Sequence, residues 1–263
     1  AKIPIEDRGF QFSDSVYEVI KIINKKILDF DFHMRRLKFS TSELKFNFKV
    51  NSILLKKIFQ NLIIKNKLSN GIIYLQITRG VQLREHAYKK NLKPNVVVYT
   101  AKKKFNLPNK NYKGFKAITY PDIRWGRPDI KTTSLLANII AATEASKKGA
   151  YETILVKGKK ITEASHSNVW IVKGNKIITH PANKEILKGV TRTVLINIIK
   201  SLGFKIIEKE FSLKELYRSD EVFITSSGSL VTPIIQIDNI KINNKKIGKI
   251  TKTLALSFYK SII

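Results

Sequence analysis

Apolar and polar residues follow two different periods along the first half of the chain, which indicates both strands and helices. Residues 16–23 are largely apolar and are followed by Asn24 and Lys25, which predicts a strand, a turn and a returning strand over residues 26–30. Within residues 51–68, apolar side chains recur every three or four positions, which is typical of an amphipathic helix. Three further elements are expected in this half, a helix at 33–44 and strands at 71–78 and 94–101.

The second half contains short apolar runs that are separated by turn residues. Segments 156–161 and 172–177 have similar sequences around Gly158 and Gly174, which predicts two hairpin turns of one antiparallel sheet. Ser212 and Glu215 have the spacing of a capping box, so a short helix is expected there. The other expected elements are strands at 115–120, 221–225 and 233–237, helices at 133–148, 191–202 and 250–263, and a hairpin turn at Asn243-Asn244.

A polar stretch at residues 102–113 has little apolar content and is interpreted as a linker. The sequence therefore predicts a small N-terminal domain over 1–104, a linker over 105–111 and a larger domain over 112–263. The mixture of strands and helices places the protein in the α/β (α+β) class. A long polar loop at 79–92 lies inside the first domain, and long loops often carry function.

The composition excludes several classes of protein. With 43% hydrophobic and 26% charged residues, the 263-residue chain is globular rather than disordered. It has no cysteine, which excludes disulfides, thiolate zinc sites and cysteine nucleophiles. There is no apolar run of membrane-spanning length and no signal-peptide pattern at the first residues, so a cytoplasmic protein without a membrane partner is expected.

The net charge of +29 has two possible meanings, a nucleic-acid-binding surface or a general bias towards lysine. The lysines are scattered and form no stripe with aromatic residues, and arginine, which binds phosphate and base edges best, is rare. These observations favour a lysine bias, and no nucleic-acid partner is expected.

Several segments contain residues suited to binding an anion. Val190 and Thr191 follow a glycine at the start of an apolar helix, and a helix N-terminus presents N–H groups and partial positive charge. Ser227 lies in a Ser-Ser-Gly-Ser turn after a predicted strand, where small residues allow a phosphate to approach the backbone. Arg36 lies in a predicted helix and adds a full charge. Each feature also has an ordinary explanation, as a helix start, a solvated turn or a surface arginine.

Other candidates are equally ambiguous when taken singly. Glu163 stands in a polar stretch that interrupts an apolar sheet, where a carboxylate must be paired or solvated. Lys131 precedes a predicted helix, but one lysine says little in so lysine-rich a chain. Arg84 and His86 lie in the long loop and could hold a carboxylate.

In combination and in this order, these residues resemble a known family. Lys131-Thr132-Thr133 is followed by Glu163-x-Ser165-x-x-Asn168-Val169, and then by Leu187-Lys188-Gly189-Val190-Thr191-Arg192. This order resembles class IV aminotransferases, which are fold type IV enzymes that use pyridoxal 5′-phosphate. Further similar segments run from Glu6-Asp7-Arg8-Gly9 to Val231-Thr232-Pro233. The resemblance implies a two-domain enzyme with the cofactor between its domains.

The resemblance also implies a role for each candidate residue. Lys131 would hold the cofactor as a Schiff base and would move a proton between the substrate Cα and the cofactor. Glu163 would face the pyridine nitrogen and keep it protonated. The remaining residues implied to bind the cofactor are Arg36, Val190, Thr191 and Ser227 at the phosphate, and Leu187 at the ring.

Within the class, Arg84-x-His86 is similar to a motif of D-amino-acid aminotransferases, in which this pair and a tyrosine matching Tyr17 bind the substrate carboxylate. The similarity implies amino transfer from a D-alanine-like substrate to a 2-oxo acid such as 2-oxoglutarate. The matching family loop crosses a dimer interface, so a homodimer is expected. No metal ligands are expected in the site. Three alternatives stay open: a branched-chain L-amino-acid aminotransferase, an aminodeoxychorismate lyase of the same fold, and a basic nucleic-acid-binding protein without catalysis.

The chain departs from the family pattern at several points. The first family strand has no counterpart before residue 1, so the edge of the small-domain sheet is expected to differ. His166 stands where serine is common, Trp170 where phenylalanine or tyrosine is common, and Gly228 where threonine is common. We expect the His166 side chain to point to solvent rather than towards Glu163.

Overall fold

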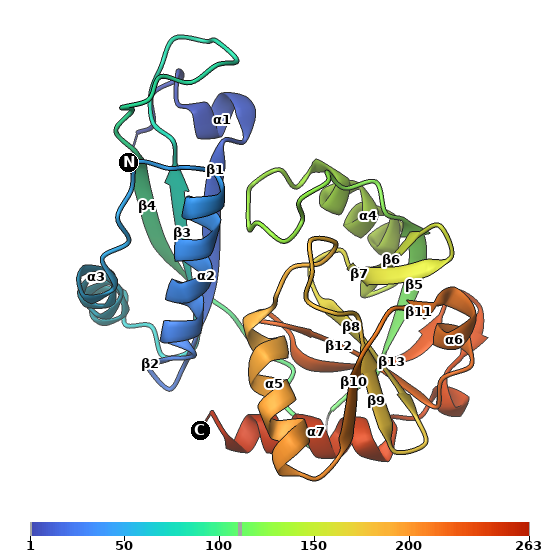
Figure 1. Ribbon diagram of the computed structural model, residues 1–263. Helices are drawn as coiled ribbons and strands as arrows, with labels where there is room; N and C mark the ends of the chain where they lie inside the picture. Colours follow the sequence, from blue (N-terminus) through green and yellow to red (C-terminus); the bar gives the residue numbers. More distant parts are fainter. Residues whose placement is uncertain (1, 110–111, 263) are drawn as a thin grey trace. The chain divides into compact units, whose positions relative to one another are not determined.

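The computed structural model describes residues 2–109 and 112–262, and it contains two compact units. The first unit comprises residues 1–104 and 130–134, and the second comprises 105–129 and 135–263. Segment 130–134 therefore packs with the first unit, although the chain on both sides of it belongs to the second. Both units combine strands and helices (Figure 1), in agreement with the predicted α/β class.

The first unit is built on an antiparallel sheet with the strand order β2-β1-β3-β4. β1 and β3 pair without a break in register, from Ser15 opposite Thr78 to Ile22 opposite Gly71. The elements of this unit are α1 (Arg8–Phe12), β1 (Ser15–Ile23), β2 (Lys26–Ile27), α2 (Phe30–Glu43), α3 (Ser52–Lys65), β3 (Gly71–Thr78) and β4 (Asn95–Lys102).

One face of this sheet forms the core of the first unit. Alternate side chains of a strand point to the same side, so Val16, Ile20 and Ile73 are all completely buried. They pack with Leu37 of α2 and Phe59 of α3, which are also completely buried. Burying each such side chain contributes roughly 1.5–3 kcal/mol, so this face is the main source of stability of the unit.

The junction between β2 and α2 differs from the prediction. The returning strand ends at Ile27, and the helix already begins at Phe30. Asp29 has a left-handed backbone with φ of 55°, which ends the strand. Its carbonyl oxygen accepts hydrogen bonds from the N–H groups of Phe32 and His33, at 3.0 and 3.2 Å, and these start the helix. A strand extending to residue 30 and a helix beginning at 33 are therefore wrong here.

The second unit contains a ten-stranded mixed sheet with the order β10-β9-β8-β12-β13-β5-β6-β7-β11, and β14 pairs with β13. The pairs β9/β10, β5/β13 and β5/β6 are parallel, and the other pairs are antiparallel. Its strands are β5 (Phe115–Pro121), β6 (Glu152–Lys157), β7 (Lys160–Ala164), β8 (Asn168–Lys173), β9 (Lys176–Thr179), β10 (Lys205–Glu208), β11 (Phe211–Ser212), β12 (Glu221–Ser226), β13 (Leu230–Ile237) and β14 (Ile240–Lys241). Its helices are α4 (Leu136–Lys147), α5 (Val190–Ser201), α6 (Leu213–Tyr217), the 3₁₀ turn η1 (Asn243–Lys245) and α7 (Lys249–Lys260).

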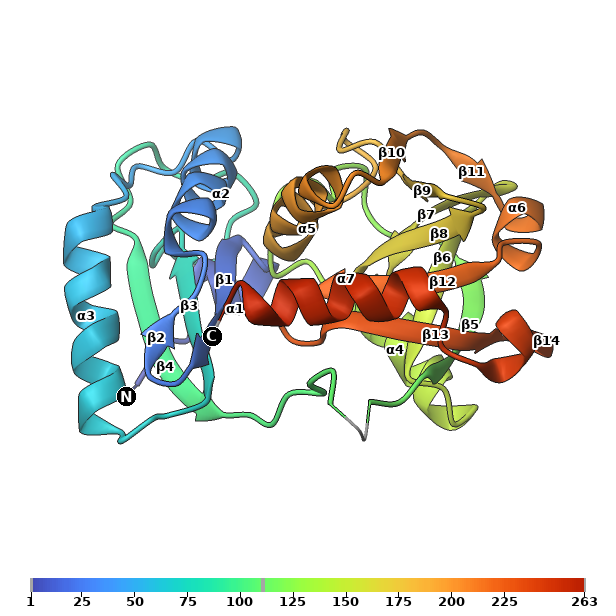
Figure 2. The same cartoon turned by 90° about the horizontal axis from the view of Figure 1, so that it is seen from below.

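Helices α5 and α7 cover one face of the central strands of the second unit, and a second group of buried apolar side chains includes Phe211 of β11 and Leu216 of α6. Helices α5 and α7 contact each other and pack on β12 and β13 (Figure 2). Trp170 and Phe223 are cross-strand partners whose rings stack, with centroids 5.5 Å apart. The indole N–H of Trp170 donates to Thr225 Oγ1 at 2.9 Å, so this completely buried aromatic residue also has its polar atom satisfied. Trp170, which stands where the family commonly has phenylalanine or tyrosine, is therefore part of the core.

The predicted turns have mixed outcomes. Both hairpins are confirmed, but the sheet that contains them is mixed rather than antiparallel. Gly158 and Gly174 adopt the positive φ of 61° and 58° that glycine tolerates. The capping box is confirmed by reciprocal hydrogen bonds between Ser212 and Glu215. The hairpin turn expected at Asn243-Asn244 is wrong, because the turn between β13 and β14 comes earlier and residues 243–245 form a 3₁₀ turn. Among the residues that the structure describes, no helix has the length and hydropathy needed to cross a bilayer.

Candidate active site

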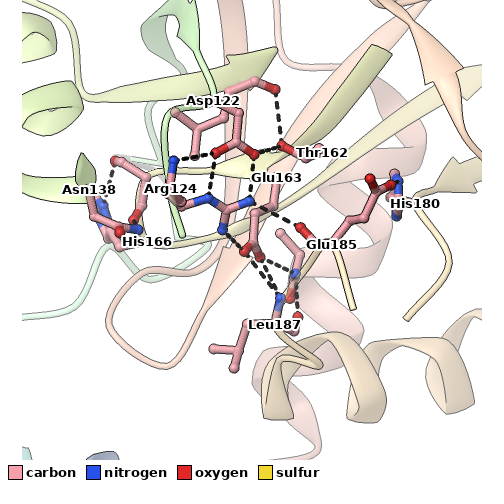
Figure 3. Close-up of polar contacts among 12 residues, drawn as sticks. Asp122, Arg124, Asn138, Thr162, Glu163, His166, His180, Glu185 and Leu187 are labelled. Carbon is pink, nitrogen blue, oxygen red and sulfur yellow. Dashed lines mark hydrogen bonds and ion pairs between the residues drawn. The ribbon is translucent and has the colours of Figure 1, made fainter. Parts of the chain in front are cut away.

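Glu163 lies near the end of β7, and hydrogen-bond donors surround its buried carboxylate (Figure 3). Both of its oxygens accept from the Leu187 N–H, at 3.1 and 3.2 Å. Oε2 also accepts from Nδ2 of Asn168 at 3.0 Å, and Arg124 forms an ion pair with Oε1. The polar stretch in the apolar sheet therefore contains a fully paired carboxylate.

Arg124 is held in place by a second carboxylate. Its Nε and Nη2 donate to the two oxygens of Asp122, both at 2.8 Å. Nη2 also donates to the carbonyl oxygen of Glu185 at 3.1 Å, while Asp122 accepts from Oγ1 of Thr162 at 2.7 Å. Only 5% of the Arg124 side chain is exposed. Glu163 is thus fixed by a buried charged network that joins β7 to the loop after β5.

The surroundings of Glu163 perturb its acidity. Burial raises the pKa of Glu163 to about 7, although Arg124 and the Leu187 N–H oppose that rise. A carboxyl group with a pKa close to 7 can hold or release a proton at neutral pH, which is typical of residues that take part in catalysis.

Asn168 connects Glu163 to the start of α5. Its Nδ2 donates to the Leu187 carbonyl oxygen at 2.8 Å, in addition to Glu163. Its Oδ1 lies where a side chain at position 189 would have to be, since a Cβ on Gly189 would come within 2.2 Å of it. Glycine is therefore required at 189 by close packing. The first residues of α5, Val190 and Thr191, follow directly and are buried.

The Ser226–Ser229 turn lies at the same end of the sheet. Thr225 is the cross-strand partner of Asn168, and the turn begins at the next residue. Ser226 Oγ accepts from two backbone N–H groups of the turn, at 3.1 and 3.2 Å, which fixes its shape. The structure therefore gathers all the cofactor residues predicted in the second unit at one end of β7, β8 and β12: Glu163, Leu187, Val190, Thr191 and Ser227.

Lys131 belongs to the first unit, where segment 130–134 pairs with the beginning of β1. Its carbonyl oxygen accepts from the Tyr17 N–H at 3.0 Å, and its own N–H donates to Oγ of Ser40 at 3.2 Å. Nζ lies 4.1 Å from the centroid of the Tyr17 ring, within reach of a cation–π contact. Backbone pairing therefore places this half-buried amine over an aromatic ring.

Arg36 forms a bidentate ion pair with Glu18, a carboxylate in the core of the first unit. Nε and Nη2 donate to the two oxygens of Glu18, at 2.8 and 2.7 Å, and His33 Nδ1 lies 2.7 Å from Oε2. Burial alone would raise the pKa of Glu18, but Arg36 and His33 lower it to about 2. Glu18 is therefore ionised and fixes the orientation of Arg36; the phosphate-binding role of Arg36 stays a prediction.

Arg84 and His86 are exposed side chains in the loop between β3 and β4. The guanidinium of Arg84 lies 5.1 Å from the centroid of the Phe12 ring, and the His86 ring lies 5.6 Å from it. In the described chain, the contacts of these two residues do not reach Tyr17. Within a single chain, Tyr17 therefore contacts Lys131, but it does not contact Arg84 or His86.

Arg8 anchors this loop to α1. Its Nη1 and Nη2 donate to the carbonyl oxygens of Glu85 and His86, at 2.7 and 3.0 Å. Its Nε donates to Asp14 at 2.9 Å, and its guanidinium stacks on Phe12 at 4.7 Å from the ring centroid. Arg8 is 4% exposed, so the backbone of the Arg84-x-His86 motif, at Glu85 and His86, is held by a buried charged group.

His166 points to solvent, as expected, with 56% of its side chain exposed. Its Nδ1 lies 3.0 Å from Glu152 rather than near Glu163. Glu152 is buried and accepts from the His166 N–H and from Oγ of Ser167, both at 2.8 Å. It therefore supports the turn that follows Glu163, while Asn138 of α4 donates to the Ser165 carbonyl oxygen at 2.7 Å (Figure 3).

Sequence reasoning missed Arg124, Asp122 and Glu18 as members of these clusters. Glu163 and Arg124 are separated by 39 positions in the chain, so no local pattern connects them. The scarcity of arginine in a lysine-rich chain was a usable signal, because arginine is preferred where a buried carboxylate needs a planar, permanently charged partner.

Comparison with known proteins gives a consistent family assignment. The model of the amino-transferase class IV family matches residues 15–237. D-alanine aminotransferase of Listeria monocytogenes (strain 10403S) is 38% identical over 264 residues, which cover 100% of this chain and 91% of that protein. D-alanine aminotransferase of Bacillus licheniformis is 38% identical over 262 residues, covering 99% of this chain and 92% of that protein.

The fold agrees with this assignment. The crystal structure of the Escherichia coli branched-chain amino acid aminotransferase superposes with a TM-score of 0.90 at 23% identity, covering 99% of this chain and 89% of that one. That likeness concerns the fold alone, and it confirms the predicted fold type IV architecture. Together with the sequence matches along the whole chain, it shows that this protein belongs to the class IV aminotransferase family.

Proposed function

We propose that this protein transfers the amino group of a D-amino acid, with D-alanine as the model substrate, to a 2-oxo acid such as 2-oxoglutarate. The observation that carries the proposal is the identity of 36–38% with several D-alanine aminotransferases over nearly all of the chain. The Arg84-x-His86 loop supports the same substrate class, because a guanidinium beside an imidazole suits a carboxylate.

Each unit offers donors that suit pyridoxal phosphate. Lys131 offers an amine for a covalent link, and among the described residues no carboxylate is paired with its Nζ. Glu163 offers a buried carboxyl group whose pKa of about 7 suits a proton shared with a ring nitrogen. The start of α5 and the Ser226–Ser229 turn offer backbone N–H groups and hydroxyls, which suit a phosphate. When bound, this cofactor supplies an electron sink that stabilises negative charge at the substrate Cα.

The residues of the chain then have distinct tasks. The Lys131 amine would move a proton at the substrate Cα. The Tyr17 ring beside Nζ restricts where the amine can move. Arg124 and the Leu187 N–H hold the Glu163 carboxyl in one orientation, so its proton is presented from a fixed position.

The active unit in this proposal is a homodimer in which the Arg84-x-His86 loop serves the site of the partner. The loop pair is exposed and does not contact Tyr17 within its own chain, which is compatible with a role in a second chain. Mixing the Lys131→Ala and Arg84→Ala variants tests this arrangement. Recovery of activity in the mixed dimer is expected if the sites are shared, whereas a simple average of the two variants contradicts sharing.

The reaction is tested by measuring pyruvate formation from D-alanine and 2-oxoglutarate with the purified protein, and by comparing L-leucine as amino donor. Borohydride reduction followed by peptide mapping should place the cofactor on Lys131. The Lys131→Ala variant should lose transamination and the mapped adduct, while Lys159→Ala, an exposed lysine in the β6–β7 hairpin, should keep both.

Three results would overturn the proposal. Turnover confined to L-leucine would indicate a branched-chain aminotransferase. Pyruvate release from aminodeoxychorismate without any 2-oxo acid would indicate the lyase. Binding of nucleic acid that weakens steeply with salt, in a protein without visible cofactor absorbance, would indicate the non-catalytic alternative.

A further inference from the structure

His180 directly follows β9, and only one of its two ring nitrogens forms a hydrogen bond with the described residues. Nδ1 lies 2.9 Å from the carbonyl oxygen of Pro181. A carbonyl oxygen cannot donate, so Nδ1 must carry the proton, and the lone pair of neutral His180 is on Nε2. The side chain is only 2% exposed, and Nε2 makes no hydrogen bond with the described residues. This arrangement, with the second nitrogen bonded to a backbone carbonyl, is the one that most metal-binding histidines adopt.

Two carboxylates face the available nitrogen of His180. Glu185 Oε2 lies 3.6 Å from Nε2, and ligand atoms of His180, Glu185 and Glu210 all lie within 4.8 Å of one another. Zinc–ligand distances of about 2.0–2.2 Å place two ligands of a tetrahedral site roughly 3.4 Å apart. The pair of His180 and Glu185 already has that separation, and Glu210, whose side chain is 37% exposed, needs only a small movement.

The topology explains why residues so distant in sequence meet here. β9 and β10 are parallel neighbours, with Thr179 opposite Glu208. Their carboxyl ends therefore lie side by side, and His180 and Glu210 follow just after those ends. Glu185 is carried back by the loop that leads to α5, and Figure 3 shows it beside His180.

The charges around the cluster leave the carboxylates able to bind a cation. Glu185 Oε1 pairs with Lys157 at 2.9 Å, which leaves Oε2 directed at His180. Glu210 pairs with Lys160. Both lysines are more than 60% exposed, so these pairs contribute little and can remain as outer partners of a bound ion.

We propose that His180, Glu185 and Glu210 form a binding site for a divalent transition-metal ion of the zinc type, with water completing the coordination. One imidazole and two carboxylates are a ligand set that zinc accepts. Their nitrogen and oxygen donors are harder ligands than thiolates, which this chain cannot provide because it has no cysteine. The site does not depend on the proposed transamination. It does adjoin the Glu163 cluster, because the Glu185 carbonyl oxygen accepts from Arg124 and Leu187, two residues later, donates to Glu163.

The site is tested by titrating zinc chloride into the 263-residue chain in a phosphate-free buffer, with calorimetric detection. We expect one ion per chain. Glu185→Gln and Glu210→Gln should each weaken binding by about tenfold or more, because loss of even an outer partner of a metal site has an effect of that size. Glu144→Gln is the matched control. Glu144 also pairs with a lysine on the surface of the second unit, at 2.8 Å, but it is not part of the His180 cluster, so this variant should not change binding.

The identity of the ligands is checked by X-ray absorption at the zinc edge, which should show one imidazole nitrogen and otherwise oxygen. The proposal is overturned by the absence of stoichiometric uptake. It is equally overturned by uptake that both variants leave unchanged, or by a coordination shell with two or more imidazoles. Far-ultraviolet circular dichroism of each variant establishes that any loss of binding occurs in a folded chain.

Discussion

Replacement of Arg124 by methionine removes the charge that holds two buried carboxylates, and its cost can be worked from the structure. Removing one partner of a buried ion pair costs about 3–5 kcal/mol. Both carboxylates keep other donors: Asp122 keeps Thr162, and Glu163 keeps Asn168 and Leu187. We therefore expect a loss near the lower limit, about 3 kcal/mol in the free energy of unfolding of the second unit.

The matched control is Arg127→Met. Arg127 also pairs with an aspartate two residues away, with contacts of 2.9 and 2.8 Å to Asp129, but its side chain is 30% exposed instead of 5%. Partly exposed pairs contribute about 0–1 kcal/mol, so this variant should lose little stability. Geometry and spacing are nearly equal in the two arginine–aspartate pairs, so the difference between the variants reports burial together with the second carboxylate, Glu163, that only Arg124 pairs with.

Urea denaturation followed by tryptophan fluorescence measures the required quantity. The chain has two tryptophans, Trp125 and Trp170, and both belong to the second unit, so the signal reports that unit. The loss in Arg124→Met should be larger at pH 8 than at pH 6. The pKa of Glu163 is about 7, so at pH 6 most of the carboxyl is protonated and the missing charge matters less. Equal losses in Arg124→Met and Arg127→Met would refute the buried-network interpretation.

Three further predictions concern the first unit. Burial lowers the pKa of Lys21 to about 8, from 10.5 in the free side chain, so the charged form of Lys21 destabilises the fold. Lys21→Met should therefore stabilise the fold by up to about 3 kcal/mol at pH 7. Thermal unfolding should show that this gain in stability becomes smaller as the pH rises from 8 to 10.5. Because the pKa of Glu18 is lowered to about 2, its stabilising contribution should be lost as the pH falls from about 4.5 to 2, and an acid titration of Glu18→Gln should lack that component. If the proposed function holds, Arg84→Ala should raise the KM for D-alanine by a factor equivalent to about 1.5–3 kcal/mol. Arg8→Gln should also raise this KM while leaving kcat nearly unchanged, because Arg8 holds the backbone of the loop. Steady-state kinetics in which neither variant changes KM would exclude the loop from the site.

The sequence predicted regular elements well where its own pattern was long. Strand β3 was expected at 71–78 and is found there, because a run rich in apolar and β-branched residues ends shortly before Gly80. Helix α1 was missed, because five residues form barely more than one turn and show no periodicity. The early start of α2 depends on the left-handed backbone conformation of Asp29, and a hydrophobic pattern does not predict such a conformation.

The candidate site divides along the same line. Lys131, Glu163 and the start of α5 could be proposed as site residues from the sequence because each stands in a short, ordered motif. Arg124 could not, because it meets Glu163 only through the pairing of β5 with β6 and of β6 with β7. The same holds for His180 and Glu210, which only the parallel pairing of β9 with β10 brings together.

The five residues at 130–134 have a practical consequence for dissecting this protein. They are integrated into the first unit through the pairing of Thr132 with Val16 and of Thr133 with Ser15, yet the polypeptide reaches them from the second unit and returns to it. A fragment cut after residue 104 would keep the pairing of β1 with β3 but would lose the neighbour on the other side of the start of β1, and it would also lack Lys131. Any recombinant version of the small unit must therefore carry this peptide on an artificial tether, or it will be neither intact nor chemically complete.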